Sequence, residues 1–502
     1  MQKSYILPFS VLAAVPFIMV LGNSMLIPVL PEMRNALNLT QFQSGLIITL
    51  FSVPAGVTIP LAGLLSDRVS RRWIIAGALI IYAAGGLIAG LGSVLLKSYR
   101  IILAGRVLQG IGAAGTAPIA MALSSDIFTS NERSKVLGML EASNGMGKVV
   151  SPILGSAIGL IAWWAVFFLF PIICVPLALG MLFLVKEPQQ KKSPQSLSEY
   201  RKDLGKIFKK KGISLIMTFL AGSVVLFVLF GVLFYLSEHL ETRYGLDGIV
   251  KGLVLAIPVL AMATTSYITG LVTQKRTNLH KALVVLGTGI LSGAMFLAAF
   301  FIQNTYLMIA ALVLAGIGTG MVLPNLNTMI TSSCNIDERG MITSLYGGVR
   351  FFGVALGPPL FGLLMEKSEL IMFIVPAILT AVVGVLNFFF CNAKLLKQKP
   401  EQDKGEGISP SIRQKPRQKP IKARLVWGIL FRIIRPKKPL LRPATEIKED
   451  IVEKVVKELE PQIDKALQDE LSNQKEKLKE EVSQEIEKYL EDTIEIKEKE
   501  RK

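Results

Sequence analysis

Long apolar segments separated by short polar stretches follow one another from the N-terminus to about residue 392. Each has about the 20 residues that an α-helix needs to cross a bilayer. Inside hydrocarbon, a helix satisfies its own backbone hydrogen bonds. The pattern therefore predicts an all-α membrane protein with twelve transmembrane helices, at residues 6–30, 43–65, 73–93, 100–124, 136–160, 163–185, 213–236, 248–272, 281–302, 305–330, 342–364 and 370–391.

One long stretch of the chain occurs twice. Residues 107–154 recur at a constant offset of 206 residues, with Gly110, Gly112, Pro118, Glu132, Arg133, Gly147, Pro152 and Leu154 repeated as Gly316, Gly318, Pro324, Glu338, Arg339, Gly353, Pro358 and Leu360. The offset places the fourth and fifth segments on the tenth and eleventh. It predicts two pseudo-symmetric six-helix halves, residues 1–185 and 213–392. A parallel repeat of two membrane halves is typical of one large class of secondary transporters.

Charged residues give the chain an orientation. Residues 186–212 are polar and rich in lysine, which predicts a cytoplasmic linker between the halves. Lysine and arginine gather in alternate loops, on the side that carries this linker. The positive-inside rule then predicts a multi-pass protein of the cell membrane with both termini in the cytoplasm.

Composition excludes an ordinary soluble domain, since 51% of the residues are hydrophobic and the mean hydropathy is +0.50. The formal net charge of +18 comes from residues in the loops and just after the last apolar segment. Anionic lipid headgroups explain such a distribution better than nucleic acid does, so no nucleic-acid partner is expected.

The tail beyond the last apolar segment has two parts. Residues 393–444 are basic and contain a short apolar run at 425–434, which suits either an interfacial anchor or a disordered basic tail. Residues 445–502 are rich in Glu and Lys and have apolar positions spaced by four or seven, which predicts an amphipathic helix. Coiled-coil pairing, by self-association or with a protein partner, and adsorption to a surface are equally compatible with that helix.

Candidate chemistry for catalysis is missing from the sequence. Cys174, Cys334 and Cys391 have no metal-ligand spacing, and His239 and His280 are isolated, which predicts surface positions for the histidines. There is no nucleophile–base set and no phosphate-binding Gly-Lys-Ser/Thr loop. We therefore expect no enzyme activity, no metal and no cofactor.

Prolines and charges mark the first two segments. Pro28 and Pro31 close the first segment, and prolines there bend a helix end, either as part of a gate or as a purely structural kink. The loop from Gly63 to Arg72 carries Asp67 near a helix start, opposite Arg68, Arg71 and Arg72. These charges suit a latch that holds the cytoplasmic side shut in one state. The alternative is that the arginines only set the topology.

Two further motifs lie in the fourth and fifth segments. Arg106 stands at membrane depth in residues 103–114, among glycines that permit close helix packing. An arginine inside the bilayer costs several kcal/mol unless it faces a partner or water, so Arg106 is a functional-site candidate. The fifth segment carries Gly147, Ser151, Pro152 and Gly155.

Together these four motifs resemble those of the major facilitator superfamily, and within it the twelve-span drug:proton antiporters, over about residues 5–392. Ser70 stands where glycine is usual, and serine replaces two glycines in the fifth segment. The resemblance implies a role for Arg106 in proton coupling. It also implies export, because the motif around Pro152 separates exporters from importers.

Other polar residues at membrane depth are candidates for transport. Glu141 and Lys148 are seven residues apart, on one face of the fifth segment and about 10 Å along it. Glu141 is the clearest buried carboxylate and hence the expected proton carrier, since Asp126 lies at a helix end. The candidate substrate-binding residues are Lys148, Asn23, Asn144, Asn325 and Arg350.

Three functions compete at this stage. The first is export of small amphiphilic, drug-like compounds in exchange for protons by alternating access. The second is transport of anionic solutes or lipid-linked molecules, because three intramembrane cations outnumber one acid. The third is a membrane scaffold that acts through its C-terminal helix. Intact transport motifs weigh against the scaffold.

Overall fold

The computed structural model describes residues 6–66, 68–128, 130–187, 197–275, 279–333, 336–392 and 396. Within these residues the secondary structure is helical, as the apolar segments predict. The expected basic segment and amphipathic helix of the tail lie outside the described residues, and so does Asp67.

Eleven helices of the described residues are long and apolar enough to cross a membrane. The fifth predicted segment is also a helix, α7 (Ser130–Gly159), but it is not among the eleven. Its 30 residues include Glu141 and Lys148 besides three charges in the first two turns, and such residues lower its hydropathy. All twelve predicted segments are thus helical.

Two of the predicted segments are broken. The first consists of α1 (Ile6–Ser24), the 3-10 helix η2 (Ile27–Val29) and α2 (Leu30–Leu37). Pro28 and Pro31 stand at the starts of η2 and α2, where a missing backbone N–H is tolerated. The fourth consists of α5 (Tyr99–Ala114) and α6 (Ala117–Ile127).

The N-terminal half is completed by α3 (Gln41–Ser66), α4 (Arg71–Val94), α7 and α8 (Ala165–Leu184). Its main contacts pair α4 with α5 and α8, α3 with α5, and α1 with α7 and α8. Gly112 shows how closely two helices approach here, since a Cβ atom on it would lie 2.5 Å from the backbone nitrogen of Tyr82. Small residues are therefore required where α4 meets α5.

The C-terminal half contains α9 (Leu197–Tyr244), α10 (Gly248–Lys275), α11 (His280–Phe300), α12 (Thr305–Thr331), α13 (Ile336–Lys367) and α14 (Glu369–Phe390). Its contacts repeat those of the first half: α11 with α12 and α14, α10 with α12, and α9 with α13 and α14. Residues 197–212 of the predicted linker belong to α9, so that the seventh span continues a helix that begins in the linker.

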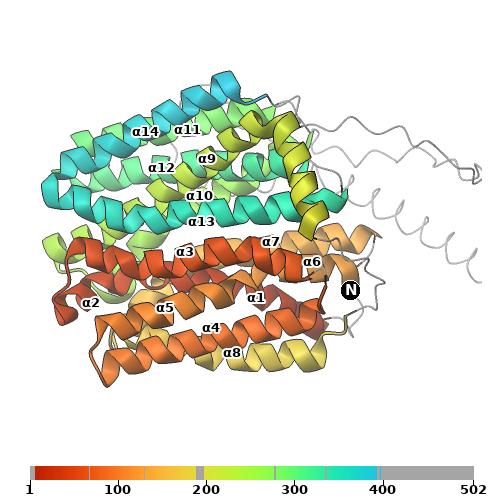
Figure 1. The fold of residues 1–502 in the computed structure, drawn as a ribbon. Coiled ribbons are helices and arrows are strands. Elements are labelled where there is room, and N and C mark those ends of the chain that lie inside the picture. Colours follow the sequence, from red (N-terminus) through yellow and green to blue (C-terminus); the bar gives the residue numbers. More distant parts are fainter. Residues whose placement is uncertain are drawn as a thin grey trace, which may run out of the picture. The chain divides into compact units, whose positions relative to one another are not determined.

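The halves meet along two helix pairs that the repeat relates, α3 with α13 and α7 with α10. Figure 1 shows α3 and α13 side by side along their length. Gly56 and Gly348 form one close approach, because a Cβ on Gly56 would lie 2.8 Å from the carbonyl oxygen of Gly348. The structure thus has the two pseudo-symmetric halves that the offset predicts.

Candidate functional site

Arg106 is fully buried inside the N-terminal half, at 0% exposure. Its guanidinium donates to the carbonyl oxygen of Ile47 at 3.0 Å, to Oε1 of Gln109 at 2.7 Å and to Oδ1 of Asn23 at 2.8 Å. It also lies over the ring of Phe51, 4.4 Å from the centroid. All these partners are neutral. The charge is held by dipoles and an aromatic face, which lowers the cost of burying it.

Asn23 is committed to this network. Its carbonyl oxygen accepts from Arg106, and its Nδ2 donates to Oγ of Ser52 at 2.7 Å. Arg106 thus connects α1, α3 and α5 through Asn23 and Ile47. Asn23 lies near the end of α1, just before the break in the first span, which we call helix 1 and which consists of α1, η2 and α2. The structure therefore places this candidate substrate-binding residue as a partner of Arg106. Nε2 of Gln109 is buried without a hydrogen-bond partner among the described residues.

A second group of charges, the interior charge cluster, consists of Glu141, Lys148 and Arg350. Lys148 on α7 interacts electrostatically with Glu141 on the same helix and with Arg350 on α13 of the other half. Arg350 donates to Oδ1 of Asn327 at 3.2 Å. The cluster therefore brings cations from both halves toward one another.

Exposure within the cluster differs from the expectation. Lys148 and Arg350 are half-buried, but Glu141 is exposed rather than buried; the candidate Asn144, also on α7, is half-buried. A close contact of α7 with α10 lies further along the helix, where a Cβ on Gly252 would lie 2.7 Å from the carbonyl oxygen of Pro152. Arg106 does not join the cluster, since its recorded partners lie on α1, α3 and α5. The three cations thus divide into two sites.

The signature loop leads into α4, at the end of the bundle that we call the Arg71 end. Arg71 forms an ion pair with Asp126 at the end of α6. Glu187 covers the start of α4: its carboxylate accepts from the backbone N–H of Arg71 at 3.0 Å, from that of Arg72 at 3.2 Å and from the hydroxyl of Ser70. An acid at a helix N-terminus is favourable because it meets free N–H groups and the positive end of the dipole.

Sequence reasoning did not find Glu187, because a single acid after the sixth span carries no distinguishing pattern. Arg68 follows α3 and its backbone N–H donates to the carbonyl of Leu65. Gly63 faces α13, where its Cβ would lie 3.3 Å from Oγ of Ser344. Of the predicted latch, the described arginines therefore lie at one end, with Arg71 held by Asp126.

The remaining candidates are buried. Asn325 on α12 is fully buried; its Oδ1 lies 2.7 Å from Nδ1 of His280, and its Nδ2 donates to the carbonyl of Met321 at 2.6 Å. The prediction that His239 and His280 lie on the surface is wrong, since both are buried. His239 has Tyr235 and Thr305 as partners, so each ring is accommodated by hydrogen bonds.

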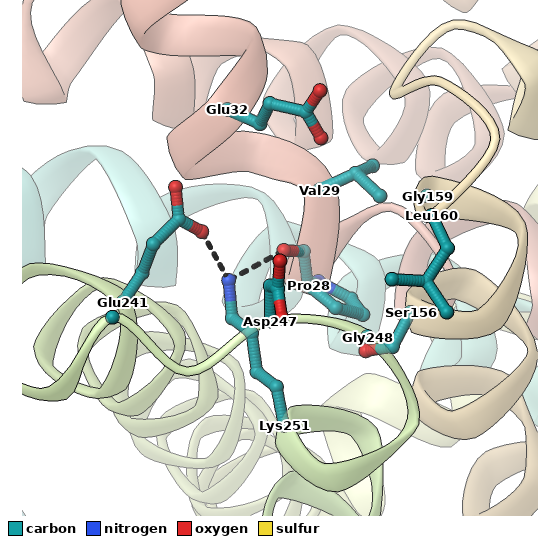
Figure 2. Close-up of a pocket in the computed structure, with 11 residues that line it drawn as sticks. Pro28, Val29, Glu32, Ser156, Gly159, Leu160, Glu241, Asp247, Gly248 and Lys251 are labelled. Carbon is teal, nitrogen blue, oxygen red and sulfur yellow. Dashed lines mark hydrogen bonds and ion pairs between the residues drawn. The ribbon is translucent and has the colours of Figure 1, made fainter.

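At the opposite end, which we call the Pro28 end, contacts join the two halves. Lys251 on α10 is 2% exposed, and its Nζ donates to the carbonyl oxygen of Pro28 at 2.7 Å and to Oε2 of Glu241 at 2.6 Å (Figure 2). Ser237 donates to the carbonyl of Ile27 at 2.9 Å. The sequence does offer a signal for Lys251, which is a charge inside the predicted segment 248–272, but our sequence reasoning missed it.

A cavity of about 310 Å³ lies beside these contacts. Glu32, Glu241 and Asp247 contribute carboxylates to its wall, and Lys251 is the cation among them (Figure 2). Because its lining comes from η2, α2 and α7 of one half and α9 and α10 of the other, the cavity spans the two halves at the Pro28 end.

The sequence profile of the Major Facilitator Superfamily matches residues 12–293 and 245–441. The Bacillibactin exporter of Bacillus subtilis (strain 168) is 44% identical over 399 residues, which are 79% of this chain and 98% of that protein. Multidrug resistance protein 2 of the same organism is 25% identical over 369 residues, covering 72% of this chain and 89% of the relative. The class B tetracycline resistance protein of Escherichia coli is 26% identical over 366 residues, covering 69% and 86%.

Solved structures show the same fold. A bacterial homologue of the human lysosomal transporter Spinster, in an inward-facing and occupied conformation, has a TM-score of 0.65 and 18% identity, covering 79% of this chain and 99% of that one. The D-xylose-proton symporter has a TM-score of 0.63 and 13% identity, covering 78% and 99%. Helical fold, repeat and relatives agree on a multi-pass membrane transporter with efflux-type homologues, not an enzyme. The chain belongs to the Major Facilitator Superfamily.

Proposed function

We propose that the chain exports a small anionic amphiphile in exchange for protons by alternating access. The proposal that the substrate is anionic rests on the interior charge cluster, where Lys148 of one half and Arg350 of the other interact electrostatically. Two cations from opposite halves and one acid leave a net positive site, which attracts anions. A substrate anion between them relieves their mutual repulsion, so it also favours approach of the halves.

Similarity suggests a first compound to test. The relative that is 44% identical over nearly its whole length is a Bacillibactin exporter, so bacillibactin is the substrate that we propose to try first. The runner-up is broad export of drug-like compounds, which the multidrug and tetracycline resistance relatives support at 25–26% identity.

Proton coupling in this proposal rests on Glu141. Glu141 is an exposed residue of α7 and interacts electrostatically with Lys148, which couples its charge to the cluster. Protonation of Glu141 removes a negative charge beside Lys148 and makes the cluster more positive, which changes its affinity for an anion. Asp126 is the weaker alternative because Arg71 already holds it in an ion pair.

Orientation follows the positive-inside rule. We propose that the Arg71 end faces the cytoplasm and the Pro28 end faces outward, with both termini inside. Arg68, Arg71 and Arg72 then lie at the level of anionic lipid headgroups, where basic residues are favoured.

The test is pH-gradient-driven transport by purified protein in liposomes, with bacillibactin and with a cationic and an anionic compound of one scaffold. We expect bacillibactin and the anion to be transported and the cation to compete poorly. Lys148→Met is expected to weaken anion binding by roughly tenfold, the scale of one charge-assisted contact. Arg100→Met, an exposed cation outside the cluster, is the control. Preferred transport of the cation would favour the multidrug alternative.

A further inference from the structure

Lys251 is a buried ammonium group on the boundary between the two halves. It starts from α10 of the C-terminal half and reaches the carbonyl oxygen of Pro28 in the N-terminal half, at 2.7 Å. Its other partner, Glu241, lies on α9 of its own half, at 2.6 Å. The two bonds therefore differ in kind. The ion pair with Glu241 stays within one half, and the bond to Pro28 joins the halves.

The break in helix 1 provides a second acceptor for the opposite half. Pro31 has no backbone N–H, so the usual helical bond to the carbonyl of Ile27, four residues earlier, cannot form. That carbonyl accepts from the N–H of Leu30 and, across the boundary, from the hydroxyl of Ser237 at 2.9 Å. The prolines of helix 1 thus leave a carbonyl available to the other half.

The same boundary has a more exposed ion pair. Arg34 on α2 donates to Oε1 of Glu238 on α9 at 2.6 Å, with side-chain exposures of 25% and 9%. Partly exposed ion pairs contribute little free energy of stabilisation, whereas breaking a hydrogen bond to a buried charge costs considerably more free energy. Among the described contacts between the halves at this end, the bond from Lys251 to Pro28 is therefore expected to be the strongest.

We infer that Lys251 is the latch of the extracellular gate. Its bond to the Pro28 carbonyl, assisted by the bond from Ser237 to Ile27, holds the outer ends of the two halves together in this state. Both bonds must break when the halves separate at the Pro28 end, so they stabilise one state of the alternating-access cycle and not the other. Glu241 is a positioning residue, because it holds the ammonium aimed at helix 1.

Release of the latch leaves no orphaned charge. Glu241 moves with Lys251, since both belong to the C-terminal half. Asp247 of the same half also lines the cavity beside the ammonium. Glu241 and Asp247 compensate Lys251 when the gate opens and water enters, which keeps the open state accessible. A latch without such partners would hold the gate shut permanently.

The inference rests on alternating access and on the orientation proposed above, but not on the substrate or on protons. It is therefore tested without transport, by spin-label distances across the outer ends in purified protein. Labels at Ile161 and Tyr306 suit this, as they are 79% and 86% exposed. Ile161 follows the end of α7 at the cavity, and Tyr306 follows Thr305, whose hydroxyl meets that of Tyr244. The three native cysteines are first replaced by serine.

Lys251→Met keeps the length of the side chain and removes its charge and its bonds. The fraction of long distances, with the outer ends apart, is expected to rise about tenfold to a hundredfold relative to the closed form, the scale of one buried charge-assisted hydrogen bond. Glu32→Gln is the matched control, since it removes a charge from the same cavity but no recorded bond to Lys251. It is expected to leave the distances nearly unchanged.

Ser237→Ala provides a second, independent variant. It removes the bond to the Ile27 carbonyl without removing a charge, and it leaves the Lys251 ammonium unchanged. It is expected to shift the distances in the same direction by a smaller factor. An unchanged distance distribution in both Lys251→Met and Ser237→Ala would overturn the inference, and so would an equal shift in Glu32→Gln. Should Lys251→Met fail to fold, Ser237→Ala decides alone. Failure of export with a working latch would instead count against the proposed function.

Discussion

At the scale of single residues, charge and burial separate the roles of Arg106, Glu141 and Lys148. Arg106 is enclosed by neutral acceptors, which suits a fixed positive centre inside the N-terminal half. Glu141 is exposed and Lys148 is half-buried, so both can respond to ions or substrate. The enclosed Arg106 is therefore the least suitable of the three for proton exchange.

Glu141→Gln is expected to uncouple export from the proton gradient. The amide keeps the size of the side chain but cannot take up or release a proton, so substrate exchange continues while accumulation against a gradient is lost. The measurement is substrate movement in liposomes with and without a pH gradient, with Glu366→Gln, an exposed acid of α13, as the control. A variant that still concentrates substrate with the wild-type pH dependence would place the coupling acid elsewhere.

The sequence predicts Arg106 as a functional candidate because an isolated charge at membrane depth is visible in the pattern. Gln109 lies three residues from Arg106 on the same helix, but Asn23 and Ile47 come from two other helices and no spacing in the sequence links them to Arg106. The same holds for Lys251, whose position is visible in the sequence but whose partner is not. A lysine within an apolar segment stands out in the sequence. Its partner is the backbone carbonyl of Pro28, and whether that carbonyl can accept a hydrogen bond depends on tertiary packing.

At the scale of elements, polar contacts decide where helices begin and break. The apolar pattern predicts the long helices, and Pro28 and Pro31 predict a bend at the end of the first, but hydropathy alone does not indicate that the fourth is divided. It also ends the linker too late, because residues 197–212 are polar and yet form the start of α9. The polar composition of these residues is like that of a loop, so it does not show that they continue the buried helix.

Glu187→Ala is expected to weaken the start of α4 by about 1 kcal/mol, the scale of a helix N-cap. The backbone N–H groups of Arg71 and Arg72 lose their acceptor in this variant. Hydrogen exchange measured on peptides covering residues 70–75 should accelerate roughly fivefold. Peptides from α11 serve as the internal reference, and equal protection in both proteins would mean that Glu187 does not cap the helix.

At the scale of the whole molecule, the repeat carries over into the contacts between the halves. A Cβ on Gly252 of α10 would lie 2.7 Å from the carbonyl oxygen of Pro152 on α7. A Cβ on Gly45 of α3 would lie 2.5 Å from the backbone nitrogen of Pro359, next to Pro358 on α13. Pro152 and Pro358 are equivalent in the repeat, so each boundary places a helix glycine against a repeat-related proline.

These two glycines permit the halves to close, which gives a prediction for the complete molecule. Gly252→Val and Gly45→Val are each expected to push the halves apart at the Pro28 end, because overpacking of a tight contact costs about 1–3 kcal/mol. The label distance between positions 161 and 306 should lengthen in each variant. The sites lie on different helix pairs, so their free-energy effects should add in the double variant.

Gly77→Val is the matched control, since a Cβ on Gly77 meets nothing within 4 Å and the loss of glycine in a helix is otherwise the same. Wild-type distances in the control and longer ones in the other two variants would tie the state of the molecule to these contacts. If instead Gly252→Val and Gly45→Val only lower thermal stability and leave the distances unchanged, the glycines serve packing alone. In that case closure of the Pro28 end depends on the polar contacts of Lys251 and Ser237, and the repeat explains the architecture of the two boundaries without explaining their motion.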